Sequence, residues 1–112
     1  MKIRIAAMLA LGLAVAGCAS VDSVSSLDPT FFGSTARTAK DYSVCVAEAW
    51  KGQGFEVETT PIQDGFRVAG SSSISVEGVL SVISYRGKTD IKLSTRLPAR
   101  GQSMIESANL CM

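Results

Sequence analysis

The sequence contains no histidine, and its charges nearly cancel. Eleven Lys and Arg side chains stand against ten Asp and Glu, which gives a formal net charge of +1. Without histidine, the usual general base and the commonest transition-metal ligand of proteins are missing. A nucleic-acid-binding protein needs a surplus of positive charge to displace counterions from phosphates. We therefore expect a protein that is not an enzyme, holds no metal or other cofactor and binds no nucleic acid.

Long hydrophobic runs are also missing. The uncharged apolar run over residues 5–15 has eleven residues, and a membrane-spanning helix needs about 20. The run follows Lys2 and Arg4, a combination typical of a secretory signal peptide. The next residues, Val15-Ala16-Gly17-Cys18, resemble the lipobox of bacterial lipoproteins, in which small residues precede a cysteine whose thiol accepts a diacylglycerol.

This resemblance implies how the chain is processed and where it resides. The signal peptide, residues 1–17, would be removed, and Cys18 would carry acyl chains such as palmitate, two of which suffice for stable membrane anchoring. The residue after the cysteine is Ala19 rather than the aspartate that retains lipoproteins at the inner membrane. In a Gram-negative host this favours the outer membrane, with the domain in the periplasm or at the cell surface. The chain is similar to short proteobacterial envelope lipoproteins with one Cys in an early helix and another near the C-terminus.

Residues 18–35 are predicted to form a flexible tether after the lipidated cysteine. They are rich in serine, contain Pro29 and show no periodic apolar face, and a loose segment of this length spans roughly 20–25 Å. The adjacent Phe31 and Phe32 are the exception. They either pack on the edge of the domain or meet a partner.

Residues 36–112 are predicted to form one small α+β domain. Apolar residues at helical spacing predict helices over 36–51 and 102–111. Alternating residues predict four strands between them, over 55–59, 66–70, 74–86 and 88–97. Consecutive hairpins give an antiparallel four-stranded sheet, in the order α-β-β-β-β-α, with both helices packed on one face. Apolar residues of both parities in 74–86 indicate a central strand or a bulge at Gly78.

The two remaining cysteines are predicted to form a disulfide. Cys45 lies on the apolar face of the first helix and Cys111 on that of the last. An even pair in an oxidising compartment favours a bridge. A redox enzyme would show a C-x-x-C motif, and a cysteine-only metal site needs at least three thiols. The pair is therefore interpreted as structural.

A row of charged side chains alternates with the apolar face of the last predicted strand. Its basic members, with Arg67 from an earlier strand, form a candidate contact surface: Arg67, Lys88, Lys92 and Arg96. The row is either a site for an acidic partner or glycan, or the solvated face of the sheet.

These patterns favour a membrane-anchored lipoprotein that acts as a non-enzymatic interaction or accessory module of the cell envelope, with an envelope protein as partner. The alternative is a lipoprotein that binds a small envelope ligand, such as a lipid, a peptide or a glycan.

Overall fold

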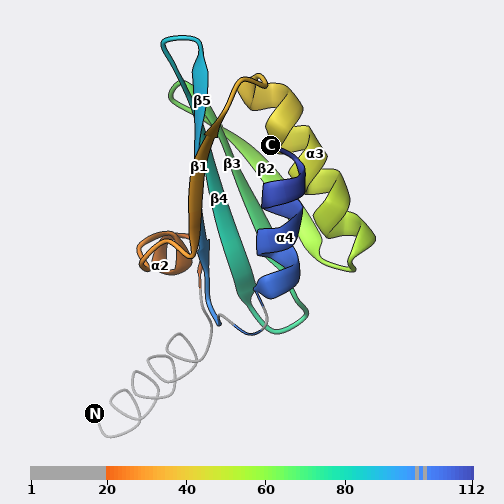
Figure 1. Ribbon diagram of the computed structural model, residues 1–112. Coiled ribbons are helices and arrows are strands. Elements are labelled where there is room, and N and C mark those ends of the chain that lie inside the picture. The colour runs from red at the N-terminus through yellow and green to blue at the C-terminus, as the bar shows by residue number, and fades with distance from the viewer. Residues whose placement is uncertain (1–19, 98, 100) are drawn as a thin grey trace, which may run out of the picture.

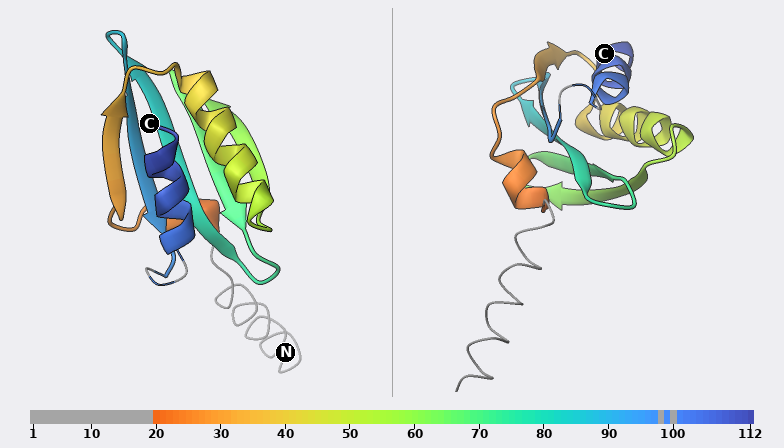
Figure 2. Two further views of the ribbon diagram at one scale, coloured as in Figure 1. Left: turned by 45° about the vertical axis from the view of Figure 1, so that its right-hand side comes forward. Right: turned by 90° about the horizontal axis from the view of Figure 1, so that it is seen from below.

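The computed structural model describes residues 20–97, 99 and 101–112. They form one five-stranded antiparallel sheet, in the order β1-β5-β4-β3-β2 (Figure 1). Helices α3 and α4 cover one face of the sheet, the inner face, and α2 lies on the opposite, outer face (Figure 2). The elements in chain order are α2 (Val21–Ser25), β1 (Phe31–Thr35), α3 (Ala39–Gly52), β2 (Glu56–Ile62), β3 (Gly65–Ser71), β4 (Val76–Tyr85), β5 (Lys88–Thr95) and α4 (Gln102–Leu110).

The expected α+β fold is confirmed, but the prediction of four strands is wrong. The fifth strand, β1, lies within the predicted tether and pairs along β5, from Phe31 opposite Leu93 to Thr35 opposite Thr89. Phe31 packs on the core, and the Thr35 hydroxyl donates a 2.6 Å hydrogen bond to the carbonyl of Met112. A five-residue strand with one glycine and one serine has little pattern of its own. Its partner strand, more than fifty residues further along the chain, stabilises it.

The described part of the tether also contains a helix, so the prediction of a flexible segment over 18–35 is wrong for residues 20–35. Ser20 and Ser23 form a capping box at the start of α2. The Ser20 Oγ accepts from the Ser23 amide at 3.2 Å, and the Ser23 Oγ accepts from the Ser20 amide at 2.9 Å. The buried side chain of Val24 packs on Ala69 and Val79 of the outer face. Serines that resemble a linker in the sequence thus cap a helix.

Helix α3 has the predicted apolar face but begins three residues later than predicted. Thr38 is the N-cap, and its hydroxyl accepts a 3.1 Å hydrogen bond from the amide of Asp41. Tyr42, Val46 and Trp50 point inward and are fully buried. The helix ends at Gly52, and Gly54 turns the chain with a φ of 94° into β2.

The long strand β4 is both a central strand and the site of a bulge, next to the predicted Gly78. Gly70 of β3 pairs with Gly78 and Ser71 pairs with Val76, so Glu77 is the extra residue. Beyond the bulge, Leu80 and Val82 enter the core beneath the two helices, whereas Val79 meets α2 on the outer face. Both faces of the strand are therefore partly covered, which explains its apolar residues of both parities.

Helix α4 lies beside α3 and seals the core. Met104 and Ala108 are fully buried, and the Tyr42 hydroxyl donates a 2.6 Å hydrogen bond to the carbonyl of Ala108. The Met104 Cε lies 2.6 Å from where a Cβ on Gly70 would stand. The absence of a side chain at that position therefore makes room for the methionine. The predicted placement of both main helices on one face is confirmed (Figure 2).

Candidate functional site

The predicted disulfide between Cys45 and Cys111 is present. The S–S distance is 2.10 Å, and the two Cα atoms lie 5.9 Å apart. Cys111 is buried and belongs to the core, together with the half-buried Cys45. The bridge joins α3 to the end of α4. Neither sulfur atom is therefore a free thiol.

The predicted lipidation site, Cys18, and the signal peptide, residues 1–17, lie outside the described residues. The described chain begins at Ser20, the N-cap of α2. Only Ala19 therefore separates Cys18 from the folded domain in the sequence.

Neither a metal centre nor a membrane span emerges from the part of the chain that the structure describes. No three His, Cys, Asp or Glu side chains gather there in a group that could hold a metal ion. No helix of that part is long and apolar enough to cross a membrane.

The charged side chains predicted as a contact surface lie on the outer face of the sheet.

Two members of the predicted contact surface lie in one row across the outer face. The strand register places Arg67 of β3 opposite Ser81 of β4, and Ser81 opposite Lys92 of β5. Phe32 of β1 stands next to Lys92 in the same row. Neighbouring strands are about 4.8 Å apart, so the Cα atoms of Arg67 and Lys92 are roughly 10 Å apart. The sheet thus brings together residues from three distant parts of the chain.

Arg67 stands at the boundary between the covered and the open part of the outer face. Its Nη1 lies 3.7 Å from the Oδ1 of Asp22 in α2. Because the Asp22 carboxylate is exposed, this ion pair is screened by water and holds the guanidinium only weakly. The Nε of Arg67 is buried and has no hydrogen-bond partner among the described residues. The side chain therefore bridges α2 and the sheet more by packing than by charge.

Arg96 belongs to a structural cluster rather than to the open surface. Its Nη2 lies 2.8 Å from the Glu77 Oε1, and its Nε donates a 2.9 Å hydrogen bond to the same oxygen. Glu77 is only 3% exposed, and its Oε2 accepts from the Ser72 hydroxyl at 2.8 Å. The pair fixes the bulge of β4 to the end of β5. Because this pair occupies its guanidinium, Arg96 is separate from the other three predicted residues.

Lys88 lies at the far end of the sheet from Arg96, where β4 turns into β5. It stands opposite Tyr85, and the guanidinium of Arg86 lies 5.3 Å from the centroid of the Tyr85 ring. Asp90 lies between Lys88 and Lys92 on the same face of β5. The basic row is therefore interrupted by one carboxylate.

An open hollow of about 340 Å³ lies between these charged side chains. Its lining residues are Ile62, Ser81, Ile83, Asp90, Ile91 and Lys92. Beside it, Phe32 is 77% exposed and Tyr85 is 60% exposed. We call this part of the outer face the distal surface, defined by Phe32, Ile62, Ile83, Tyr85, Lys88 and Lys92.

The sequence pattern singles out Phe32 but not the other apolar members of the distal surface, Ile62, Ile83 and Tyr85. The available signal was the apolar residues of both parities in 74–86. Two helices on one face cannot bury both sides of a strand. Of the adjacent phenylalanines, Phe31 packs on the core and Phe32 is exposed.

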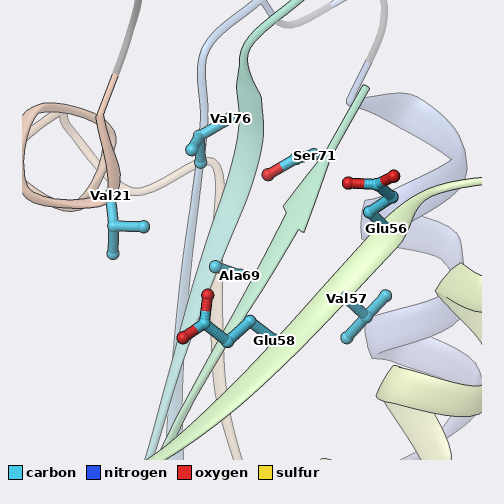
Figure 3. Close-up of a pocket in the computed structure, with 7 residues that line it drawn as sticks. All are labelled: Val21, Glu56, Val57, Glu58, Ala69, Ser71 and Val76. Carbon is cyan, nitrogen blue, oxygen red and sulfur yellow. The ribbon is translucent and has the colours of Figure 1, made fainter. Parts of the chain in front are cut away.

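A second hollow, of about 300 Å³, lies between α2 and the edge strand β2. Figure 3 shows the side chains of Glu56 and Glu58 around the same hollow as the apolar side chains of Val21 and Val76. The remaining lining residues are Val57, Ala69 and Ser71. Negative charge thus gathers near α2, whereas the distal surface carries Lys88 and Lys92.

Comparisons with models of known protein families, with curated proteins and with solved structures give no match for this chain.

Proposed function

We propose that the chain is a bacterial lipoprotein, anchored through acyl chains on Cys18, whose domain acts without catalysis as a binding module of the cell envelope. The lipobox that ends at Cys18 supports the anchor. Ala19 in place of aspartate supports the outer membrane, with the domain in the periplasm or at the cell surface. The absence of histidine from the whole sequence supports a role other than catalysis.

The observation that carries the proposed binding role is the distal surface. Phe32 and Tyr85 expose large aromatic side chains near a hollow whose lining includes three isoleucines. Aromatic anchors beside a pocket, with charges at the rim, are typical of the central contacts of protein interfaces. The positive charges of Lys88 and Lys92 at the rim of the hollow favour a partner that presents carboxylates. The expected partner is an envelope protein segment that presents apolar and acidic side chains.

The hollow itself favours a second candidate, a small envelope ligand. Its volume of about 340 Å³ lies at the lower end of the range of small-molecule pockets, about 300–1,000 Å³. Ile62 and Ile83 would contact an apolar part of such a ligand, and Lys92 an anionic group.

The anchor is tested by the intact mass of the protein purified from its own membranes. We expect the mass of residues 18–112 plus acyl chains, with the thiols of Cys45 and Cys111 alkylated only after reduction. An unacylated mass would contradict the anchor and the localisation together.

The distal surface is tested by photo-crosslinking in whole cells, with the crosslinking residue at position 32. The control is position 44, because Val44 is 50% exposed on α3, away from the outer face. We expect one discrete protein adduct from position 32 and none from position 44. Lys92→Glu should abolish this adduct, whereas Lys40→Glu, an equal charge reversal on α3, should leave it unchanged.

The same experiment separates the two candidates. Equal adducts from positions 32 and 44, or an adduct that Lys92→Glu leaves unchanged, would contradict specific binding through the distal surface. If position 32 gives no protein adduct but a protein-free envelope extract raises the melting temperature, the ligand candidate replaces the protein partner. In that case Ile83→Asp should abolish the thermal shift, because it places a charge in the hollow.

A further inference from the structure

Two exposed aliphatic side chains lie at the end of the domain where the described chain begins. Ile74, in the loop between β3 and β4, is 65% exposed, and Leu97, just after β5, is also exposed. Figures 1 and 2 show that these loops and the start of α2 lie at the same end of the sheet. We call Ile74, Leu97 and the first turn of α2 the proximal end.

The loops of the proximal end are held rigidly together. The Glu77 carboxylate accepts a hydrogen bond from the hydroxyl of Ser72, which lies in the loop that carries Ile74. The same carboxylate pairs with Arg96, the residue before Leu97, and the Arg96 amide donates a 2.8 Å hydrogen bond to the Glu77 carbonyl. The two aliphatic side chains are therefore presented by a fixed framework rather than by loose loops.

The start of α2 lies close to these loops. Val21 and Val76 line the same hollow and pack on the same small cluster (Figure 3). Val76 is two residues from Ile74 in the sequence, which is roughly 7 Å of extended chain. Any group attached just before α2 is thus near Ile74.

The chain between Cys18 and α2 is short. Three residue steps join Cys18 to Val21, and an extended chain covers at most about 3.6 Å per residue. Acyl chains on Cys18 would therefore start within roughly 11 Å of Val21. A tether long enough to lift the domain away from the headgroups does not exist, because residues 20–35 are folded into the domain.

We propose that the proximal end rests on the lipid headgroup layer, with Ile74 and Leu97 in contact with the bilayer, so that the anchored domain has one orientation. This inference rests on the proposed anchor at Cys18. The surface that fits is a zwitterionic one, since the nearby carboxylates of Asp22, Glu56 and Glu58 would repel anionic lipids. The distal surface then points away from the membrane, because Ser81, in the row of Lys92 and Phe32, lies roughly 17 Å along β4 from Val76, and Tyr85 lies about 30 Å from it.

The test uses the full lipidated protein in phosphatidylcholine vesicles whose acyl chains carry bromine, which quenches tryptophan on contact. Ile74→Trp places a reporter at the proximal end, and Tyr85→Trp places a matched reporter on the distal surface. The native Trp50 is fully buried and supplies a constant background. We expect the emission of the reporter at position 74 to shift to the blue and to be largely lost, and that at position 85 to stay unchanged.

Amide hydrogen exchange on the unsubstituted protein supplies a second measurement. On vesicles, exchange at residues 72–75 should slow relative to the Cys18→Ser protein in solution, whereas exchange at residues 86–88 should not change. Equal behaviour at the two ends by both methods would overturn the orientation.

The intact mass tells the two failures apart. If acyl chains are present and the reporter at position 74 is not quenched, the proposed anchor stands and the orientation is wrong. If no acyl chain is present, the anchor fails and the orientation fails with it.

Discussion

Reduction of the Cys45–Cys111 bridge is the perturbation whose size follows most directly from the structure. The bridge joins residues separated by 66 positions. In the chain-entropy treatment, a closed loop of that length lowers the entropy of the unfolded chain enough to stabilise the fold by about 4 kcal/mol. A domain of this size has a total free energy of unfolding of about 5–14 kcal/mol. Loss of the bridge should therefore remove a large share of the stability.

The reduced protein should nevertheless fold, because other contacts hold the C-terminus. The Tyr42 hydroxyl bonds the carbonyl of Ala108, and the Arg37 Nη1 donates a 2.7 Å hydrogen bond to the carbonyl of Cys111. The Thr35 hydroxyl bonds the last residue, Met112. These bonds join α4 to α3 and β1 without the sulfur atoms. We expect a cooperative transition at lower denaturant rather than a disordered chain.

The assay is urea unfolding followed by the emission of Trp50, the single tryptophan, which is buried beneath α4. The protein is the Cys18→Ser variant, so that the bridging cysteines are the only thiols. With a urea dependence of about 1–2 kcal/mol per molar, reduction should lower the midpoint by roughly 2–4 M. The slope should rise, because the unfolded chain expands when the loop opens.

A Cys45→Ala/Cys111→Ala double variant is the control, and reductant should leave its midpoint unchanged. A loss of less than about 1 kcal/mol on reduction would refute the loop-entropy reasoning. It would mean that the unfolded chain remains compact without the bridge, or that the bridge strains the native state.

Three further substitutions test the core, the bulge and the sheet, each by urea unfolding. Burial raises the pKa of the Tyr42 phenol above its ordinary value, so the unfolded chain loses this proton first and stability should fall as the pH rises above about 10. Tyr42→Phe should cost about 1 kcal/mol at neutral pH and weaken that alkaline loss; an unchanged alkaline profile would contradict the assignment. Glu77→Ala leaves the half-buried Arg96 without its carboxylate and should cost about 2 kcal/mol, and a neutral effect would show that water replaces the pair. A Cβ at Gly65 would collide with the backbone of Val82, so Gly65→Ala should cost about 1–3 kcal/mol, whereas Gly52→Ala, where nothing lies within 4 Å, should change little.

Much of the fold was predictable because its signals are local. Helical spacing and alternation depend on neighbouring residues, and they placed both main helices and the four strands from β2 to β5 close to their observed bounds. The disulfide followed from two cysteines on apolar helix faces. The bulge next to Gly78 was one of two alternatives that the mixed parity of β4 left open.

The errors lie where the stabilising partner is remote in sequence. β1 is a strand because β5 supplies its hydrogen bonds, and α2 is ordered because Val24 is buried against β3 and β4. Neither segment has enough local pattern to predict this, and serine is common to linkers and to helix caps. The pairing of Arg96 with Glu77 escaped the sequence analysis for the same reason. Arg96 was grouped with Lys88 and Lys92 by alternation alone, but the bulge at Glu77 brings a buried carboxylate to it.

The sequence by itself was enough to predict the main helices, four of the strands and the pairing of the two cysteines. It also carries the lipobox resemblance and the composition from which the class of protein is inferred. Tertiary structure alone decided which face of the sheet stays open, which charges are already paired, and how close the folded domain begins to Cys18. Local periodicity shows that a residue has an apolar side but not what covers it. That depends on contacts between segments far apart in the chain, which form only when the whole sheet is assembled.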